Sequence, residues 1–279
     1  MSRSWTNEGA YSQGQNVGRG WIIAETPSLI REVDPLTGSE VLTVVRGGAL
    51  QWVYDRREDG AYVGRGGVLE SLVYDAVTGR YEWITPDGRR VWFWDFDASR
   101  PVQQRGQFVR FEDSRGNVTE VTSVREDGRI EEVQRWGQVD GVTVTESYLF
   151  SYIPAGVNAG RIASITQRRR EGEGAWSVIR QAEYIYYDGV EPHGSAGDLK
   201  KVVLRDAAGA ILGTSYYRYY VAGESNGYEG GLKFVFRPAS YARLLINPLL
   251  GSSLSKSRSS RVSHSSQNRG VTRFSGGGG

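Results

Sequence analysis

The sequence contains no cysteine, one methionine and two histidines, and it has no long apolar run. The lack of cysteine excludes disulfide bonds, thiolate metal sites and a cysteine nucleophile. No stretch approaches the roughly 20 apolar residues of a transmembrane helix. Residues 1–8 also lack the apolar core of a signal peptide. We therefore expect neither a membrane span nor an export signal within this chain.

Neither sign of charge is in large excess. The chain has 34 basic and 32 acidic residues, a formal net charge of +2 and a pI of about 8.7. The two signs are mixed along the chain, and even the run Arg168–Arg170 is followed directly by Glu171. A nucleic-acid-binding surface needs clustered positive charge. This balance predicts an ordinary solvated surface and no nucleic-acid partner.

Glycine and aromatic residues are abundant, with 37 glycines and an aromatic fraction of 11%. Glycine supplies the positive φ angles of tight hairpin turns, and aromatic residues favour strands. A phrase that joins the two recurs: an aromatic-rich strand, an acidic turn, a glycine, a basic or polar residue and another strand. Its copies are Tyr74–Tyr81, Pro86–Arg89, Asp113–Asn117, Glu126–Arg129, Asn158–Arg161 and Asp206–Ala210. One such unit cannot bury its apolar face, so neighbouring units must stack into a continuous sheet.

The segments between these turns predict an all-β fold, built of repeated antiparallel β-hairpins in a curved or spiral sheet. The clearest alternation predicts a strand over Arg90–Asp97 that is covered on both faces. Residues 199–205 and 215–220 flank the turn at Gly209 as a hairpin. One short helix is predicted over residues 238–245, because proline suits the first turn of a helix.

Composition divides the chain into three parts. Residues 1–19 are polar and rich in glycine, and we expect a flexible segment there. Strand and turn signals run through residues 20–250. Residues 251–279 are mainly Ser, Arg and Gly, with too few apolar side chains to offset the entropy of ordering, so we expect a disordered tail. The repeat stops abruptly after Leu244, which favours a frameshift or truncation over a native linker as the origin of this tail.

The phrase Tyr-Asp-x-x-Thr-Gly-Arg at Tyr74–Arg80 resembles the YD repeat of RHS proteins. This family includes bacterial polymorphic-toxin shells, the BC part of insecticidal Tc toxins and animal teneurins. Further segments that look like parts of long bacterial RHS proteins are 197–202, 215–220, 231–236 and 241–244. The resemblance covers roughly residues 20–245. It implies hairpins that wind in a broad spiral sheet around a hollow shell, and a secreted or surface-displayed container that often holds a C-terminal toxin.

Two features depart from the RHS pattern. The shells of the family are far longer than this chain, so its 279 residues supply an arc of the wall. The Asp-Pro-x-Gly-Leu self-cleavage motif of the family is absent, because Asp34-Pro35 is followed by Leu36-Thr37-Gly38, which is turn chemistry. We therefore carry over neither autoprotease residues nor a toxin.

The candidate functional residues are structural, and they follow from the repeat. The residues with the repeat signature are Tyr74, Asp75, Gly79, Arg80, Asp87, Gly88, Arg89, Gly116, Asp127, Gly128, Arg129, Gly160, Arg161 and Gly209. Glycine and aspartate set the turns, while tyrosine and tryptophan fill the faces of the sheet. Exposed aromatic rings could instead stack on sugars, and the candidates for that alternative are Trp92, Trp94, Tyr216 and Tyr219.

The sequence offers little for catalysis. Asp95 and Asp97 would share one face of a strand, which suits Ca²⁺ ligation or a glycosidase acid–base pair, but they also suit the polar end of a strand. A Ser-His-Asp triad would need His193, and no Gly-x-Ser-x-Gly elbow supplies its serine. The glycine-rich segments 18–20 and 64–67 do not complete a phosphate loop. We expect no enzyme activity, no cofactor and no metal.

These observations predict a structural, non-enzymatic segment of an RHS/YD-repeat protein, part of a secreted or surface-displayed β-shell. Its partners would be the remainder of a longer shell or an enclosed polypeptide cargo. One alternative is a carbohydrate-binding or adhesive β-domain with cell-surface carbohydrate as its partner, and a further one is a β-rich glycoside hydrolase. An arc of sheet has open edges, so we also expect the isolated chain to aggregate.

Overall fold

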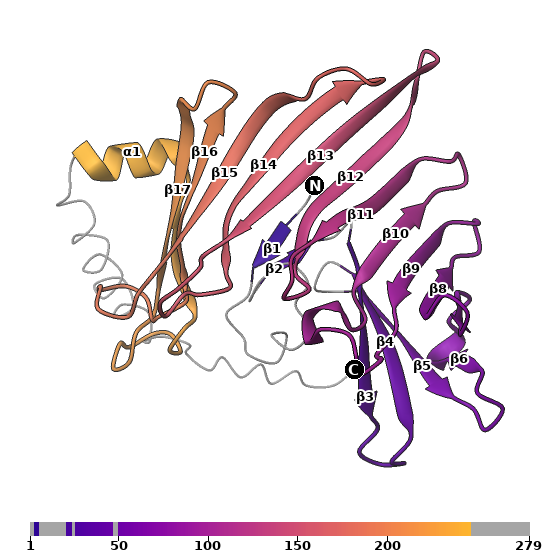
Figure 1. The fold of residues 1–279 in the computed structure, drawn as a ribbon. Helices are drawn as coiled ribbons and strands as arrows, with labels where there is room; N and C mark the ends of the chain where they lie inside the picture. The colour runs from indigo at the N-terminus through magenta and orange to yellow at the C-terminus, as the bar shows by residue number, and fades with distance from the viewer. Residues whose placement is uncertain (1–2, 6–20, 24–25, 47–49, 247–279) are drawn as a thin grey trace, which may run out of the picture.

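Antiparallel strands make up most of the structure, a computed structural model that describes residues 3–5, 21–23, 26–46 and 50–246 (Figure 1). The strands are β1 (Arg3–Trp5), β2 (Trp21–Ile23), β3 (Ser28–Val33), β4 (Glu40–Arg46), β5 (Leu50–Arg56), β6 (Tyr62–Gly64), β7 (Ser71–Asp75), β8 (Arg80–Ile84), β9 (Arg90–Trp94), β10 (Phe108–Glu112), β11 (Val118–Val124), β12 (Ile130–Val139), β13 (Val142–Tyr152), β14 (Ile162–Glu171), β15 (Ser177–Tyr186), β16 (Leu199–Asp206), β17 (Ile211–Tyr219) and β18 (Leu232–Phe236). Single turns of 3₁₀ helix lie at Arg65–Gly67 and Val102–Gln104, and α1 spans Pro238–Ile246. The predicted all-β fold of antiparallel hairpins is confirmed.

The strands β7–β18 form one sheet of 12 strands in strict chain order. Because each strand runs antiparallel to the next, the connections alternate between two ends of the sheet. We call the end with the connections after β7, β9, β11, β13, β15 and β17 the lower end, and the other the upper end. Among the described residues, β7 and β18 each have a partner in this sheet on one side, so the sheet is open at both edges.

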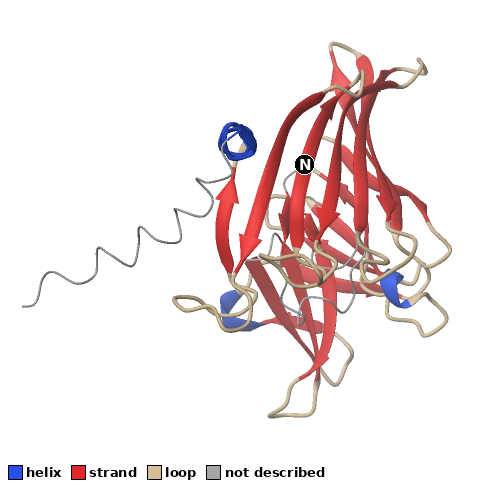
Figure 2. Ribbon diagram, turned by 90° about the vertical axis from the view of Figure 1, so that its left-hand side faces the viewer, coloured by secondary structure: helices blue, strands red, loops and turns tan. Residues whose placement is uncertain are grey.

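The large sheet is curved, as the side view in Figure 2 shows. Its pairing register shifts at the last residue of β13, β15 and β17, between Ser151 and Tyr152, Ile185 and Tyr186, and Arg218 and Tyr219. Such a β-bulge bends the strand and increases its twist. Three bulges at equivalent positions therefore give successive hairpins the same bend.

A second sheet, in the order β3-β4-β5-β6, packs against the first strands of the large sheet. Leu42, Val44 and Tyr54 from the small sheet share one buried cluster with Trp83 and Phe93. Within this cluster the Trp83 Nε1–H donates to the Tyr54 hydroxyl at 2.7 Å. Burial disfavours the charged phenolate and raises the pKa of Tyr54 to about 12. We call the face of the large sheet that carries Trp83 and Phe93 the inner face.

Two elements predicted from the sequence are present in the structure. The predicted hairpin around Gly209 is β16–β17, and the predicted short helix is α1. The strand expected over Arg90–Asp97 was too long, because β9 ends at Trp94 and Asp95 turns into the lower connection. The flexible segment expected at 1–19 and the disordered tail expected at 251–279 concern residues that lie outside the described ones, apart from β1.

Candidate functional site

The upper hairpin turns at Gly88, Gly116 and Gly209 share one backbone geometry. Each glycine N–H donates to the carbonyl oxygen three residues earlier, at 2.9, 3.0 and 3.1 Å. The φ angles of 83°, 79° and 85° lie in the left-handed region that glycine adopts without strain. A Cβ built on any of the three would meet nothing within 4 Å. No other element therefore packs against these three glycines.

The three signature glycines of the lower end, Gly79, Gly128 and Gly160, differ, because each packs against a neighbouring connection. A Cβ on Gly79 would lie 3.0 Å from Asp95 Oδ2, and one on Gly128 would lie 2.8 Å from Pro101 Cβ. A Cβ on Gly160 would lie 2.6 Å from Arg129 Nη2. The absence of a side chain at these positions thus lets successive lower connections approach each other closely.

Arginines of the repeat signature fill the space beside these glycines. Arg129 lies against Gly160, and its guanidinium is 5.7 Å from the ring centre of Tyr152. One hairpin later, Arg161 packs against Gly197 in the same way and lies 5.5 Å from the ring centre of Tyr186. Each Gly-Arg pair therefore contacts the next repeat, which gives the sequence phrase a packing role.

Three tyrosines at the lower ends of strands join the same hairpins by hydrogen bonds. The hydroxyl groups of Tyr152, Tyr186 and Tyr219 donate to the carbonyl oxygens of Ile130, Ile162 and Leu199 at 2.6, 2.9 and 2.9 Å. Each tyrosine ends a strand at a bulge, and each carbonyl belongs to the first residue of the preceding strand. The tyrosines follow one another after 34 and 33 residues. Burial raises the pKa of Tyr152 and of Tyr219 well above 10.

We call this set the lower-end ladder: Arg129, Tyr152, Gly160, Arg161, Tyr186, Gly197 and Tyr219. Sequence reasoning found Gly160 and both arginines but gave Tyr152 and Tyr186 no role as site residues. The signal that identifies them is their spacing of 34 residues, with a Gly-Arg or Gly-Asp pair following each tyrosine within a dozen positions. The contacts of the ladder join successive hairpins by packing and by hydrogen bonds.

The Tyr-Asp phrase at the start of the large sheet forms a local structural cluster. The Tyr74 hydroxyl donates to Asp95 Oδ2 at 3.2 Å, and Arg80 lies 4.5 Å from the ring centre of Trp94. The Asp75 carboxylate accepts hydrogen bonds from Thr78 Oγ1 at 2.7 Å and from the Val77 N–H at 2.9 Å. The hydrogen bond from Thr78 helps to hold the pKa of Asp75 below its ordinary value. This carboxylate fixes the turn that leads to Gly79.

The remaining signature aspartates also serve turns. Asp127 accepts from the Arg129 N–H at 3.1 Å and forms an ion pair with the Arg129 guanidinium at 2.5 Å. Asp87 pairs with Arg89 at 2.5 Å, and this contact holds the pKa of Asp87 well below its ordinary range. Both aspartates thus position the arginine two residues later.

The aspartates weighed for catalysis serve one loop. Asp95 accepts from Arg100 Nε at 2.7 Å and Asp97 accepts from the Ser99 hydroxyl at 2.6 Å, so both carboxylates bind groups within the β9–β10 connection. His193, with φ of 79°, contributes its carbonyl oxygen to the Tyr219 N–H at 2.8 Å. Burial lowers the pKa of His193. Within the described part of the chain, no cluster of three or more side chains suits a metal ion.

The four aromatic residues considered for sugar stacking do not form one row. Trp94 is flanked by the guanidinium groups of Arg80 and Arg100, and Trp92 lies near Arg110 on the same strand pair. Tyr216 is 9% exposed and packs against Phe236 and Tyr241, the second of these from α1. Tyr219 is 2% exposed. The two tryptophans are on β9 and the two tyrosines on β17, which lie far apart in the strand order of the sheet.

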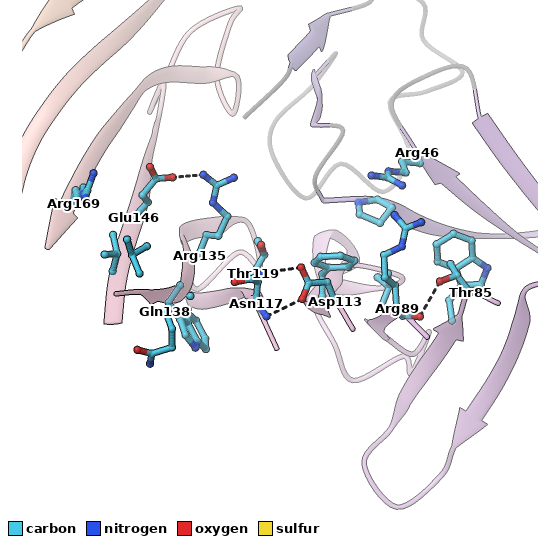
Figure 3. Close-up of a pocket in the computed structure, with 18 residues that line it drawn as sticks. Arg46, Thr85, Arg89, Asp113, Asn117, Thr119, Arg135, Gln138, Glu146 and Arg169 are labelled. Carbon is cyan, nitrogen blue, oxygen red and sulfur yellow. Dashed lines mark hydrogen bonds and ion pairs between the residues drawn. The ribbon is translucent and has the colours of Figure 1, made fainter. Parts of the chain in front are cut away.

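A pocket of about 550 Å³ lies on the inner face, beside the small sheet (Figure 3). Residues directly opposite each other on paired strands project from the same face of a sheet. A row of such partners crosses seven strands and lines the pocket: Trp83, Val91, Phe111, Thr119, Arg135, Glu146 and Arg169. The row is apolar on β8–β10 and charged on β12–β14. Arg46, Arg89 and Asp113 also line the pocket.

Comparisons with known proteins add little to this description. No family model matches the sequence, and no curated protein matches it. One solved structure with some similarity is the crystal structure of TcdB2-TccC3, at 15% identity and a TM-score of 0.22. The match covers 76% of this chain, which spans 13% of that one. No helix in the described residues has both the length and the apolarity needed to cross a membrane.

Proposed function

We propose that this chain is a structural, non-enzymatic wall segment of an RHS/YD-repeat β-shell. Its task is to continue a curved sheet from one hairpin to the next, and its partner is further sheet of the same kind. The observation that carries the proposal is the lower-end ladder, in which equivalent contacts recur in successive hairpins. An identical contact at a regular spacing extends a wall, whereas a binding or catalytic site needs different residues that converge on one point.

The two edges of the large sheet support the same role. Edge strands of self-contained proteins are usually blocked by charge, proline or a covering element. Here β7 carries Val73 at 51% exposure, and β18 carries Leu232 at 54% and Val235 at 48%. Exposed apolar side chains on both edge strands suit strands that continue into neighbouring sheet.

Self-association of the isolated chain tests this proposal. We expect sedimentation velocity to show concentration-dependent association of the full chain, since each free edge offers unpaired backbone groups. A double substitution Val73→Lys with Val235→Lys, one on each edge, should abolish the association. The matched control is Val178→Lys with Ile185→Lys, which places the same charges on exposed positions of the interior strand β15.

The control variant should associate as the unchanged chain does. A chain that remains a monomer at high concentration would contradict the wall proposal, because its edges would then be complete. Equal loss of association in both variants would assign the effect to net charge and would also count against edge pairing.

A further inference from the structure

We propose that the inner-face pocket binds a small organic anion with a flat apolar body, such as an aromatic carboxylate. This inference does not depend on the wall role, because the pocket shares no residue with the lower-end ladder. It rests on the chemistry of the two halves of the pocket, on the charge balance of its lining and on its size.

The first half of the pocket offers an apolar surface. Trp83 and Val91 line this half but are each 3% exposed, so the apolar surface open to a ligand is chiefly the partly buried ring of Phe111 on β10. Pro27 adds an apolar contribution from the segment that leads into the small sheet. A flat ring can cover the exposed part of Phe111 and displace water from it, which is the main source of affinity for apolar ligand surface.

The second property is an excess of positive charge. Four arginines, Arg46, Arg89, Arg135 and Arg169, line the pocket together with two carboxylates. Figure 3 shows these arginines distributed along the pocket from the small sheet to β14. Arginine recognises carboxylate groups through paired, charge-assisted hydrogen bonds. Arg135 pairs with Glu146, while Arg89 and Arg169 pair with Asp87 and Glu171, but each guanidinium has five N–H donors and can bind an anion as well. The lining carries two more arginines than carboxylates and therefore favours an anionic ligand.

The two carboxylates of the lining are already engaged. Asp113 accepts hydrogen bonds from Asn117 Nδ2 at 2.8 Å and from two backbone N–H groups, and the bond from Asn117 lowers the pKa of Asp113. Glu146 pairs with Arg135 at 2.6 Å and accepts from the Tyr148 hydroxyl at 3.1 Å. Because both carboxylates already have hydrogen-bond or ion-pair partners, a cationic ligand is a poor fit.

The size of the pocket restricts the ligand to a small molecule. A volume of about 550 Å³ falls within the range of sites that hold small molecules. A two-ring aromatic acid can place its rings against Phe111 and its carboxylate near Arg89. Arg89 already bonds to Asp87 through Nη2 and its Nε is buried, but the side chain is 42% exposed, which leaves Nη1 as the donor for a ligand.

Titration calorimetry with 2-naphthoate tests the proposal, with the neutral 2-naphthamide as the matched ligand. We expect saturable binding of one naphthoate per chain, and binding of the amide that is weaker by about tenfold or more, the effect of losing a charge-assisted hydrogen bond. Arg89→Gln should weaken naphthoate binding to a similar extent. The control is Arg90→Gln, the adjacent residue, which points to the outer face and pairs with Glu82.

Circular dichroism should show that both variants keep the fold, since both side chains are about half exposed. The proposal is overturned if naphthoate shows no saturable binding at millimolar concentration. It is also overturned if the acid and the amide bind equally, or if Arg90→Gln weakens binding as much as Arg89→Gln does. A Phe111→Leu variant that binds naphthoate more weakly while leaving the fold intact supports the apolar half of the site.

Discussion

At the scale of single residues, the repeat is held by buried polar contacts that recur. A buried carbonyl oxygen without a partner costs roughly 1–3 kcal/mol, and the ladder tyrosines supply that partner at the ends of β13, β15 and β17. The bulge before each tyrosine turns its side chain toward the carbonyl. The signature glycines have two roles that the local sequence does not distinguish. Those of the upper end have open space at the Cβ position, while those of the lower end leave room for a neighbouring connection.

Substitution of the ladder tyrosines measures this contribution. Tyr152→Phe, Tyr186→Phe and Tyr219→Phe each remove a hydroxyl and leave a buried carbonyl without its donor, so we expect a loss of about 1–2 kcal/mol in the free energy of unfolding. The three losses should be similar, because the three contacts are equivalent. Urea unfolding gives the values. Tyr228→Phe, at a residue that is 75% exposed, is the control and should change stability by less than about 0.5 kcal/mol.

The buried tyrosines also predict how stability depends on pH. Burial raises the pKa of Tyr54 to about 12 and that of Tyr152 and Tyr219 well above 10. Above pH of about 10 the unfolded chain loses these protons while the folded chain keeps them, so the folded state binds more protons and stability falls as pH rises. Thermal unfolding between pH 9 and pH of about 12 should show a steep loss that begins near pH 10. A melting temperature that stays level over this interval would contradict the burial of these groups.

At the scale of elements, the hairpin is the unit of the fold. Each strand of the large sheet pairs with its neighbours in sequence, so the contacts are local and turn signals could predict them. The same reasoning placed the end of β9 too late, because the contacts that draw Asp95 into the loop come from Tyr74 and Arg100. The small sheet over β7–β10 could not be predicted either. Its packing depends on residues such as Tyr54 and Trp83, which are far apart in sequence and carry no local signal of their contact.

Amide hydrogen exchange should show a gradient across the large sheet. β13 and β14 are long, lie inside the sheet and contribute Phe150 and Ile165 to a buried cluster. β18 has five residues and lies at an open edge. Exchange of backbone amides tracks local opening, so β13 and β14 should exchange slowest and β18 among the fastest. Uniform protection from β7 to β18 would show that the edges are covered.

At the scale of the whole molecule, two sheets share one core through a close backbone contact. The Leu29 N–H of the small sheet donates to the Gly106 carbonyl oxygen at 2.9 Å. A Cβ on Gly106 would overlap the Leu29 carbonyl oxygen, and Gly106 has a φ of 68°. The close approach of the small sheet to this connection therefore favours glycine at position 106.

Gly106→Ala tests this junction. We expect a loss of about 1 kcal/mol from the backbone conformation and of about 1–3 kcal/mol more from the overlap of packed atoms. Gly116→Ala is the matched control, because its φ of 79° carries the same conformational penalty while its Cβ would meet nothing within 4 Å. Urea unfolding compares the two variants. Equal losses would contradict the close contact between the sheets.

We propose that this chain is one stretch of a longer repeated wall. The nucleotide sequence downstream of the Leu244 codon, translated in all three frames, tests it most directly. We expect one frame to contain further tyrosines at intervals of 33 or 34 residues, each followed by a Gly-Arg or Gly-Asp pair as Tyr152 and Tyr186 are. The absence of such copies from all three frames would contradict the claim, and the chain would then have to act without further wall beyond β18.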